Sequence, residues 1–165
     1  MNCEDELKKV MVDYDLLKHQ YTILKNEQIR MDMLYDLFNT YTITSETDEK
    51  GIITYVSQPF LDISGYTKEE LIGKHHNIVR HEDMPKEAFA QMWKTIKAKN
   101  VWRGEVKNRT KSGGFYWVDS IVFPILNHQQ EIEGYKSIRI DITDKKKLSG
   151  MLGDLLTNEE MMLKF

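Results

Sequence analysis

The sequence predicts an α+β fold, in which a five-stranded antiparallel sheet carries helices on one face and is preceded by a long N-terminal helix. Three observations lead to this prediction. A heptad repeat of apolar residues fills the first 40 residues, the hydrophobic period then changes to two, and three strand candidates follow one another with short turns between them. We therefore divide the 165 residues into an N-terminal helix (1–40), a central domain (41–147) and a C-terminal tail (148–165).

The N-terminal segment is predicted to form a coiled-coil-like, amphipathic helix. Apolar residues recur in alternating steps of four and three from Cys3 to Phe38, interrupted only by Gln28, and the stretch contains no glycine or proline. We expect a homodimer through this helix. Because the seam includes several bulky tyrosines, a larger bundle or packing against another protein are alternatives, as is an amphipathic helix folded back on its own domain.

The residues after Thr40 predict a β-hairpin and two short helices. Thr42–Thr44 and Ile52–Val56 are β-branched runs, and the turn Asp48–Gly51 between them ends in a glycine that can take a positive φ. Pro59–Ser64 then reads as a short helix. A second short helix follows, and its hydroxyl-first, glutamate-fourth order is that of a capping box.

A longer helix and a three-stranded meander complete the central domain. Pro85 suits the first turn of a helix, and apolar residues repeat at helical spacing from Phe89 to Ile96. Strand candidates follow at Val101–Arg109, Phe115–Leu126 and Ile132–Ile142. The tail looks helical but contains two interrupting glycines, so we expect it to be partly helical or disordered.

Composition limits the class of function. A net charge of −3 and a pI near 6.0 argue against nucleic acid as a partner. Cys3 is the only cysteine, which excludes an internal disulfide and the usual zinc spacings. The N-terminus is acidic where a secretion signal is basic, and no apolar run approaches the ~20 residues of a spanning helix. We expect a cytoplasmic protein that meets a membrane only through a partner.

Residues 97–111 form a locally basic stretch. They include six basic side chains and the single carboxylate of Glu105. Such a stretch can meet a phosphate or an acidic partner, but a solvated face is the more common reading.

The densest cluster of binding-competent groups runs from His76 to Trp93. This segment combines two histidines, an arginine, an acidic pair and a proline-started helix that carries a tryptophan. Donors, charge and aromatic surface at this density suit a bound cofactor.

The chain resembles the PAS family over residues 41–147. The resemblance rests on Ile52–Val56, on Ser64–Gly73 and on Asp141–Asp144, in this order. The segment His76–Phe89 makes the resemblance more specific, because this segment is similar to the flavin-binding PAS domain of bacterial aerotaxis receptors. The layout resembles the separate sensor subunit (CetB type) of bipartite energy-taxis receptors, in which a second protein supplies the membrane anchor and the signalling domain.

The resemblance implies a PAS fold, FAD as cofactor and the redox state of the electron-transport system as input. It implies a cytoplasmic redox or energy sensor that signals to a membrane-bound chemoreceptor-like transducer, and so lies at the inner membrane only through that partner. No enzymatic activity is expected, because the chain has no nucleophile–base set, no Walker or Rossmann glycine pattern and no kinase signature.

Cofactor-binding candidates in the polar segment are Arg80, His81 and Asp83. The planar guanidinium of Arg80, with His81 beside it, suits the diphosphate, although an arginine in this position can also pair with Glu82 or Asp83. Asp83 can accept a hydrogen bond from a ribose hydroxyl or cap the helix that begins at Pro85.

Two further candidates lie outside the polar segment. Trp93 is on the apolar face of its helix, so it is either a neighbour of the flavin ring or plain core packing. The amide of Asn108 either faces the pocket and holds the flavin edge or tilts toward the following turn.

Two positions depart from the aerotaxis pattern. Glu82 stands where those receptors usually carry proline, which adds a negative charge near the expected diphosphate site. Ser57 stands where they usually carry asparagine, which is expected to remove an amide from the pocket wall.

Other classes of PAS domain suggest alternatives to a flavin-binding redox sensor. A haem-binding gas sensor would need an axial histidine, for which His75, His76 and His81 are available. A cofactor-free dimerisation module would fill the pocket with its own side chains. A photosensor that forms a cysteine adduct is excluded, because Cys3 lies in the helical segment.

Overall fold

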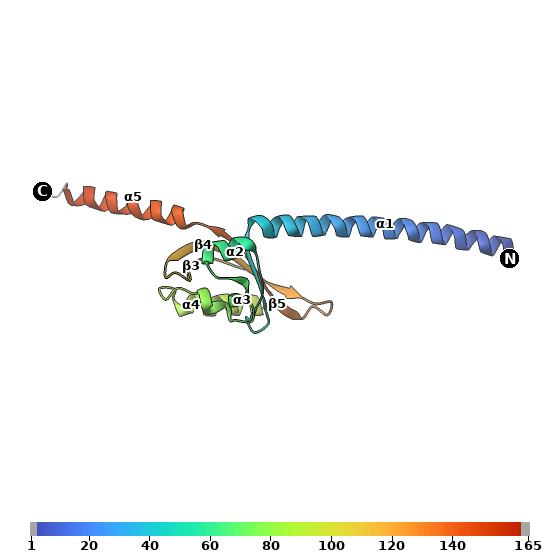
Figure 1. The fold of residues 1–165 in the computed structure, drawn as a ribbon, viewed down its shortest axis with the longest axis horizontal. Helices are drawn as coiled ribbons and strands as arrows, with labels where there is room; N and C mark the ends of the chain where they lie inside the picture. Colours follow the sequence, from blue (N-terminus) through green and yellow to red (C-terminus); the bar gives the residue numbers. More distant parts are fainter. Residues whose placement is uncertain (1–2, 163–165) are drawn as a thin grey trace. The chain divides into compact units, whose positions relative to one another are not determined.

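The computed structural model describes the backbone of residues 3–162 and the side chains of residues 4–153 (Figure 1). The chain divides into two compact units, Met1–Phe38 and Asn39–Phe165. The side chain of Cys3 and the side chains of the predicted tail beyond residue 153 lie outside the described residues. Among the described residues, no helix is both long enough and apolar enough to cross a membrane.

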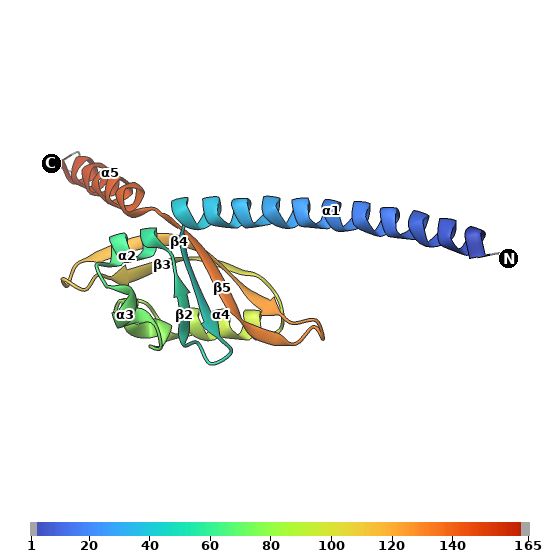
Figure 2. The ribbon, with the colours of Figure 1, turned by 45° about the vertical axis from the view of Figure 1, so that its right-hand side comes forward.

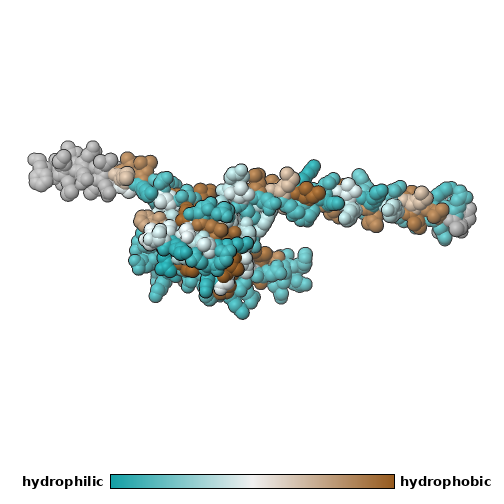
Figure 3. Space-filling model, viewed as in Figure 1, coloured by the Kyte–Doolittle hydropathy of each residue, from teal (hydrophilic) through white to brown (hydrophobic). Residues whose placement is uncertain are grey.

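Helix α1 (Cys3–Tyr41) confirms the predicted long N-terminal helix. Its sequence is rich in good helix formers, and pairs such as Glu4 and Lys8 add support one turn apart. Seam residues are exposed, with Leu17 and Leu24 each 64% accessible. Figure 3 shows apolar residues distributed along the visible face of this helix. Pairing through the seam stays a prediction.

The second unit contains the predicted five-stranded antiparallel sheet, with strand order β2-β1-β5-β4-β3. The strands are β1 (Ile43–Asp48), β2 (Ile53–Val56), β3 (Trp102–Arg109), β4 (Phe115–Leu126) and β5 (Ile132–Asp141). The hairpin and the meander are therefore confirmed. Because β5 returns to pair with β1, the two predicted groups of strands join into one sheet.

The helices cover one face of this sheet, as predicted (Figure 2). They are α2 (Gln58–Ser64), α3 (Lys68–Leu71), the 3₁₀ helix η1 (His76–Val79) and α4 (Lys86–Lys97). The capping box is present at the start of α3, where Thr67 and Glu70 bond reciprocally. Phe60 and Leu71, both fully buried, pack against inward-facing strand residues to form the core.

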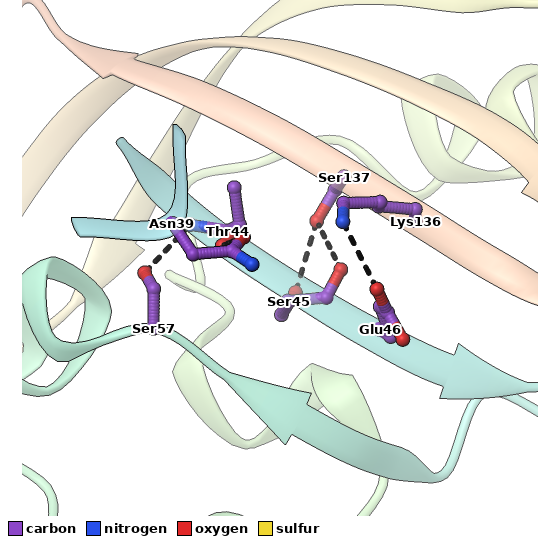
Figure 4. Close-up of polar contacts among 7 residues, drawn as sticks. All are labelled: Asn39, Thr44, Ser45, Glu46, Ser57, Lys136 and Ser137. Atoms are coloured by element: carbon purple, nitrogen blue, oxygen red, sulfur yellow. Dashed lines mark hydrogen bonds and ion pairs between the residues drawn. The ribbon is translucent and has the colours of Figure 1, made fainter. Parts of the chain in front are cut away.

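Strand β1 is longer than its β-branched run suggested. It continues through Ser45 and Glu46, which propensity alone does not mark as strand, to Thr47 and Asp48. Tertiary pairing explains the extension, because Ser45 lies opposite Ser137 on β5 and the two hydroxyls are 2.9 Å apart (Figure 4).

The predicted interruption of the tail is wrong. Helix α5 (Thr143–Met162) continues through Gly150 and Gly153. A glycine inside a helix costs about 1 kcal/mol but does not forbid the helix. The start of α5 is fixed to β4, where Thr143 Oγ1 accepts a hydrogen bond from the Trp117 N–H at 3.0 Å.

Candidate functional site

A cavity of about 600 Å³ lies between the inner face of the sheet and the segment formed by η1 and α4. This volume falls within the range of small-molecule sites. The sheet contributes alternate residues of β1, β3, β4 and β5, because successive side chains of a strand point to opposite faces. Apolar walls come from both layers, and include Ile96 on α4 and Val106 on β3.

Trp93 lines the cavity and packs against the core, as the core-packing alternative expects, while its contact with a flavin ring stays a prediction. Its ring meets Tyr135 edge to face with 5.2 Å between centroids. It also packs on the β1–β2 turn at Gly51, whose φ is +82° and where an added Cβ would lie 3.2 Å from the indole. A larger residue at position 51 would therefore strain the turn and displace the indole.

Asn108 lines the cavity from β3 and is only 4% exposed. It lies opposite Tyr116 on β4. Two buried hydroxyls near this wall, those of Tyr116 and Ser120, have no hydrogen-bond partner among the described residues. Because buried polar groups are normally paired, the orphaned Ser120 Oγ on the cavity surface points to a ligand with polar groups.

Burial also perturbs Tyr116, the cross-strand neighbour of Asn108. It raises the pKa of the Tyr116 phenol to about 12, against the opposing influences of Arg139 and Asn108. The phenol therefore stays protonated throughout the physiological range and keeps its capacity to donate a hydrogen bond.

Arg80 lines the cavity but is not an ion-paired surface arginine. Its Nη2 donates to the carbonyl of Met84 at 3.2 Å, and its guanidinium lies 4.0 Å from the centroid of the Phe89 ring. Within the described residues it forms no ion pair with Glu82 or Asp83, so the predicted alternative is wrong. An isolated bridge between Arg80 and Asn108 attaches this segment to β3.

His81 and Asp83 do not line the cavity. The Asp83 carboxylate pairs with Lys107 on β3, and this pairing lowers the pKa of Asp83. His81 Nδ1 accepts the Asp83 N–H at 3.1 Å. Asp83 does not cap α4, whose first position follows Pro85 without a side-chain cap. These two residues hold the segment that carries Arg80 against β3.

A buried polar network that the sequence did not single out forms the deep wall. His76 Nε2 lies 2.8 Å from Arg139 Nη2 and 3.0 Å from Ser45 Oγ. Since a guanidinium only donates, Nε2 accepts and the imidazole is neutral. Ser45 Oγ in turn accepts from Arg139 Nη1 at 3.2 Å. The network joins β1, β5 and η1 around the cavity.

Burial perturbs both ionisable members of this network. Desolvation, with the neighbouring charge of Arg139 adding to it, lowers the pKa of His76 to about 3. Desolvation likewise lowers the pKa of Arg139 to about 10. Arg139 is 6% exposed and has no carboxylate partner among the described residues, so it is a buried cation without a protein counter-ion.

The two departures from the aerotaxis pattern lie outside the cavity. Glu82 is exposed. Ser57 is 1% exposed and accepts the Thr44 N–H at 2.9 Å (Figure 4). Its hydroxyl also donates to the Thr42 carbonyl at 2.9 Å. The prediction that Ser57 alters the pocket wall is therefore wrong, because its hydroxyl connects α2 to β1.

The basic stretch 97–111 does not form a single unpaired surface. Arg103, Lys107 and Lys111 pair with Asp119, Asp83 and Glu70. This agrees with the solvated-face interpretation, and two further cations of the stretch, Lys99 and Arg109, donate to the backbone carbonyls of Gln130 and Ile78. Lys97, in contrast, lies at the cavity.

The cavity itself is markedly cationic in a chain whose net charge is −3. Its charged lining residues are Lys50, Arg80, Lys97, Lys136, Arg139 and one acidic residue, Glu49. Lys136 is neutralised by Glu46 at 3.0 Å. The remaining excess of positive charge favours an anionic ligand.

Comparisons with known proteins agree with this fold. A family model described as the PAS fold matches residues 53–139. The PAS domain of a Colwellia psychrerythraea protein superposes with a TM-score of 0.63 at 23% identity, covering 69% of this chain and 98% of that one. A LOV domain from the Erythrobacter litoralis blue-light-activated histidine kinase gives a TM-score of 0.58 at 16% identity, with 62% and 97% covered.

Curated relatives extend the comparison to sequence. The chain is 48% identical to the aerotaxis receptor of Escherichia coli over 105 residues, which are 64% of this chain and 21% of the receptor. It is 32% identical to the nitrogen fixation regulatory protein of Klebsiella pneumoniae over 119 residues, 72% of this chain and 24% of that protein. The chain thus spans less than a quarter of either relative. Since the family model covers more than half of its residues, the chain belongs to the PAS family.

Proposed function

We propose that this PAS domain is a redox sensor that binds FAD in the cavity between the sheet and α4. The excess of cationic lining residues around an apolar slot, in a protein of net negative charge, is the observation that carries the proposal. The 48% identity to an aerotaxis receptor supports the same assignment.

The donor set of the cavity fits a flavin. An isoalloxazine needs an apolar surface to pack against, and the edge-to-face pair of Trp93 and Tyr135 offers an aromatic wall of this kind. Its pyrimidine edge needs mixed donors and acceptors, which the Asn108 amide and the orphaned Ser120 hydroxyl supply. The buried guanidinium of Arg139 adds a positive charge that favours an anionic ring.

Haem is a weaker fit than flavin. His76 is the half-buried histidine of this wall, and its Nε2 already accepts from Arg139. An iron ligand there would displace that hydrogen bond and place a cationic guanidinium beside the metal.

Absorbance of the purified protein tests the cofactor. We expect flavin bands that bleach with dithionite, rather than a Soret band or no visible absorbance. Replacing Trp93 by alanine removes a cavity wall and is expected to weaken flavin affinity about tenfold. Trp117→Ala is the matched control, because Trp117 does not line the cavity. Equal flavin content in both variants would contradict the site.

Signalling requires that the cavity walls respond to the oxidation state. A bound FAD supplies reversible reduction, which changes charge and hydrogen bonding at its ring. Asn108 on β3 and Trp93 on α4 stand on opposite layers of the cavity, so rearrangement of either side chain changes how the two layers pack.

We further propose that the output is read by a membrane-bound, chemoreceptor-like transducer that controls energy taxis. The apolar seam of α1 supports this, since exposed residues such as Leu17 and Leu24 require a partner. A second copy of the chain pairs through this seam, and the dimer is cytoplasmic and reaches the inner membrane through the transducer. The domain itself has no catalytic role in this scheme.

Hydrogen exchange of oxidised and reduced protein tests the signalling step. We expect reduction to change protection in β3, in α4 and in the seam of α1, because the two cavity walls and the output helix respond together. The scheme fails if exchange is identical in both redox states in the sheet and in α1.

A further inference from the structure

The rim of the cavity is built where the β1–β2 turn meets α4. Asp48 Oδ1 accepts the N–H groups of Lys50 and Ile52, each at 2.9 Å, so the turn is held in one conformation. Gly51 packs against the Trp93 indole, as described above. Lys50 therefore sits next to the point at which the turn touches α4.

Lys97 reaches the same rim from α4. It lies one helical turn after Trp93, and its Nζ is 5.6 Å from the centroid of the indole ring. Lys50 and Lys97 are both exposed and both line the cavity, as does Trp93, which contacts Gly51 next to Lys50 and lies near Lys97. Neither forms an ion pair with a carboxylate among the described residues, whereas Lys107, Lys111 and Lys136 do.

The deeper cations of the cavity are already engaged by the protein. Arg80 donates to the Met84 carbonyl and stacks on Phe89. Arg139 donates to His76 Nε2 and Ser45 Oγ. The lysines at the rim are thus the cations with ammonium donors left for a ligand that extends out of the cavity.

We propose that Lys50 and Lys97 bind the phosphate groups of the flavin nucleotide at the rim, while Glu49 opposes them. The proposal rests on flavin binding in the cavity and names the residues that hold its anionic part. It assigns to the rim the diphosphate contact that the sequence suggested for Arg80 and His81. Two exposed ammonium groups that line the cavity suit a diphosphate that leaves the ring pocket toward solvent.

Glu49 provides a second test of the proposal, because it carries the opposite charge in the same turn and also lines the cavity. Its carboxylate is close enough to Tyr135 to contribute to the raised pKa of that phenol, after burial. A phosphate at the rim would be repelled by this carboxylate, so removal of the charge should act opposite to removal of a lysine.

The test compares dissociation constants of FAD, FMN and riboflavin for protein freed of its flavin. The double variant Lys50→Gln/Lys97→Gln is expected to weaken FAD and FMN about tenfold and to leave riboflavin, which has no phosphate, unchanged. Glu49→Gln is expected to tighten FAD about threefold. Lys94→Gln is the matched control, since Lys94 is an exposed lysine of α4 that does not line the cavity.

Three outcomes decide against the proposal. Equal weakening of riboflavin and FAD would place the lysines at the ring rather than at the phosphates. Unchanged FAD affinity in the double variant would exclude the rim lysines while leaving flavin binding intact. No affinity of the unmodified protein for any of the three flavins would overturn the cofactor assignment and this inference with it.

Discussion

Acidification from pH 7 to pH 5 is expected to lower the free energy of unfolding by about 2 kcal/mol through His76 alone. Burial beside Arg139 lowers the pKa of this imidazole in the folded protein to about 3. In the unfolded chain the same side chain takes up a proton near its ordinary pKa of about 6.5. Protons therefore bind preferentially to the unfolded state between these values, and stability is lost as the pH falls below 6.5.

Urea unfolding of flavin-free protein at pH 7, 6 and 5 measures this loss. His76→Gln is the informative variant, because its amide oxygen can accept from Arg139 but does not titrate. We expect the variant to lose little stability over this range. The range stops at pH 5 because Asp83 and Asp119, whose pKa values are lowered by Lys107 and Arg103, begin to contribute only at lower pH.

His128→Gln controls for the loss of a histidine as such, since His128 is exposed in the turn between β4 and β5. A wild-type slope that persists in the His76 variant would show that His76 is solvated in solution. Its hydrogen bond to Arg139 would then not define the deep wall of the cavity.

The order of helices and strands could be predicted because it is encoded locally. β-branched runs, the turn before Ile52 and the capping box at Thr67 act over a few residues. Strand β1 extends further because Ser45 and Thr47 pair with β5 residues 92 and 88 positions away. Local strand propensity holds no information about a pairing partner so far away in the sequence.

The candidate site likewise contains residues that local sequence predicts and residues whose placement depends on distant partners. Trp93, Asn108 and Arg80 could be predicted because their types and positions follow a motif, and all three line the cavity. His81 and Asp83 belong to the same motif, but Asp83 turns toward Lys107, 24 residues further along the chain, and His81 accepts from the Asp83 N–H. Proximity in sequence to a binding residue does not determine which way a side chain points.

Sequence reasoning did not identify Arg139 as a site residue, although the residue pattern of β5 indicates a polar inward face. Along β5, Tyr135, Ser137 and Arg139 occupy one face and are buried, while Ile140 on the other face is 65% exposed. The alternation therefore runs against the usual rule that apolar residues point inward. A polar inward face on a central strand marks a polar cavity, but only once the strand order shows which face is covered.

Replacing Arg139 by methionine is expected to stabilise the flavin-free domain by about 1 kcal/mol and to weaken flavin affinity at least tenfold. The guanidinium is 6% exposed and has no carboxylate partner among the described residues, and burial lowers its pKa to about 10. Keeping it charged thus costs the fold on the order of 3 kcal/mol. Part of this is offset by hydrogen bonds to His76 and Ser45, which are worth about 1 kcal/mol each.

Methionine removes the buried charge while filling much of the same volume. The acceptor on His76 need not be orphaned, because the Ser45 hydroxyl is 3.0 Å from Nε2 and can donate to it. Replacing a buried charge by an apolar side chain is often neutral or stabilising, whereas removal of one member of an ion pair is not. The absence of a carboxylate partner among the described residues places Arg139 in the first case.

Arg139→Lys separates charge from shape. It keeps the cation, so the flavin-free domain should gain no stability, but it loses the fork that bonds His76 and Ser45 together. Melting temperature and flavin affinity are measured for both variants. If methionine destabilises the domain and leaves flavin affinity unchanged, the role of Arg139 is to stabilise the folded domain and not to bind the flavin. If it stabilises the domain and weakens flavin binding, the buried cation is retained at a cost in stability because an anionic ligand neutralises it.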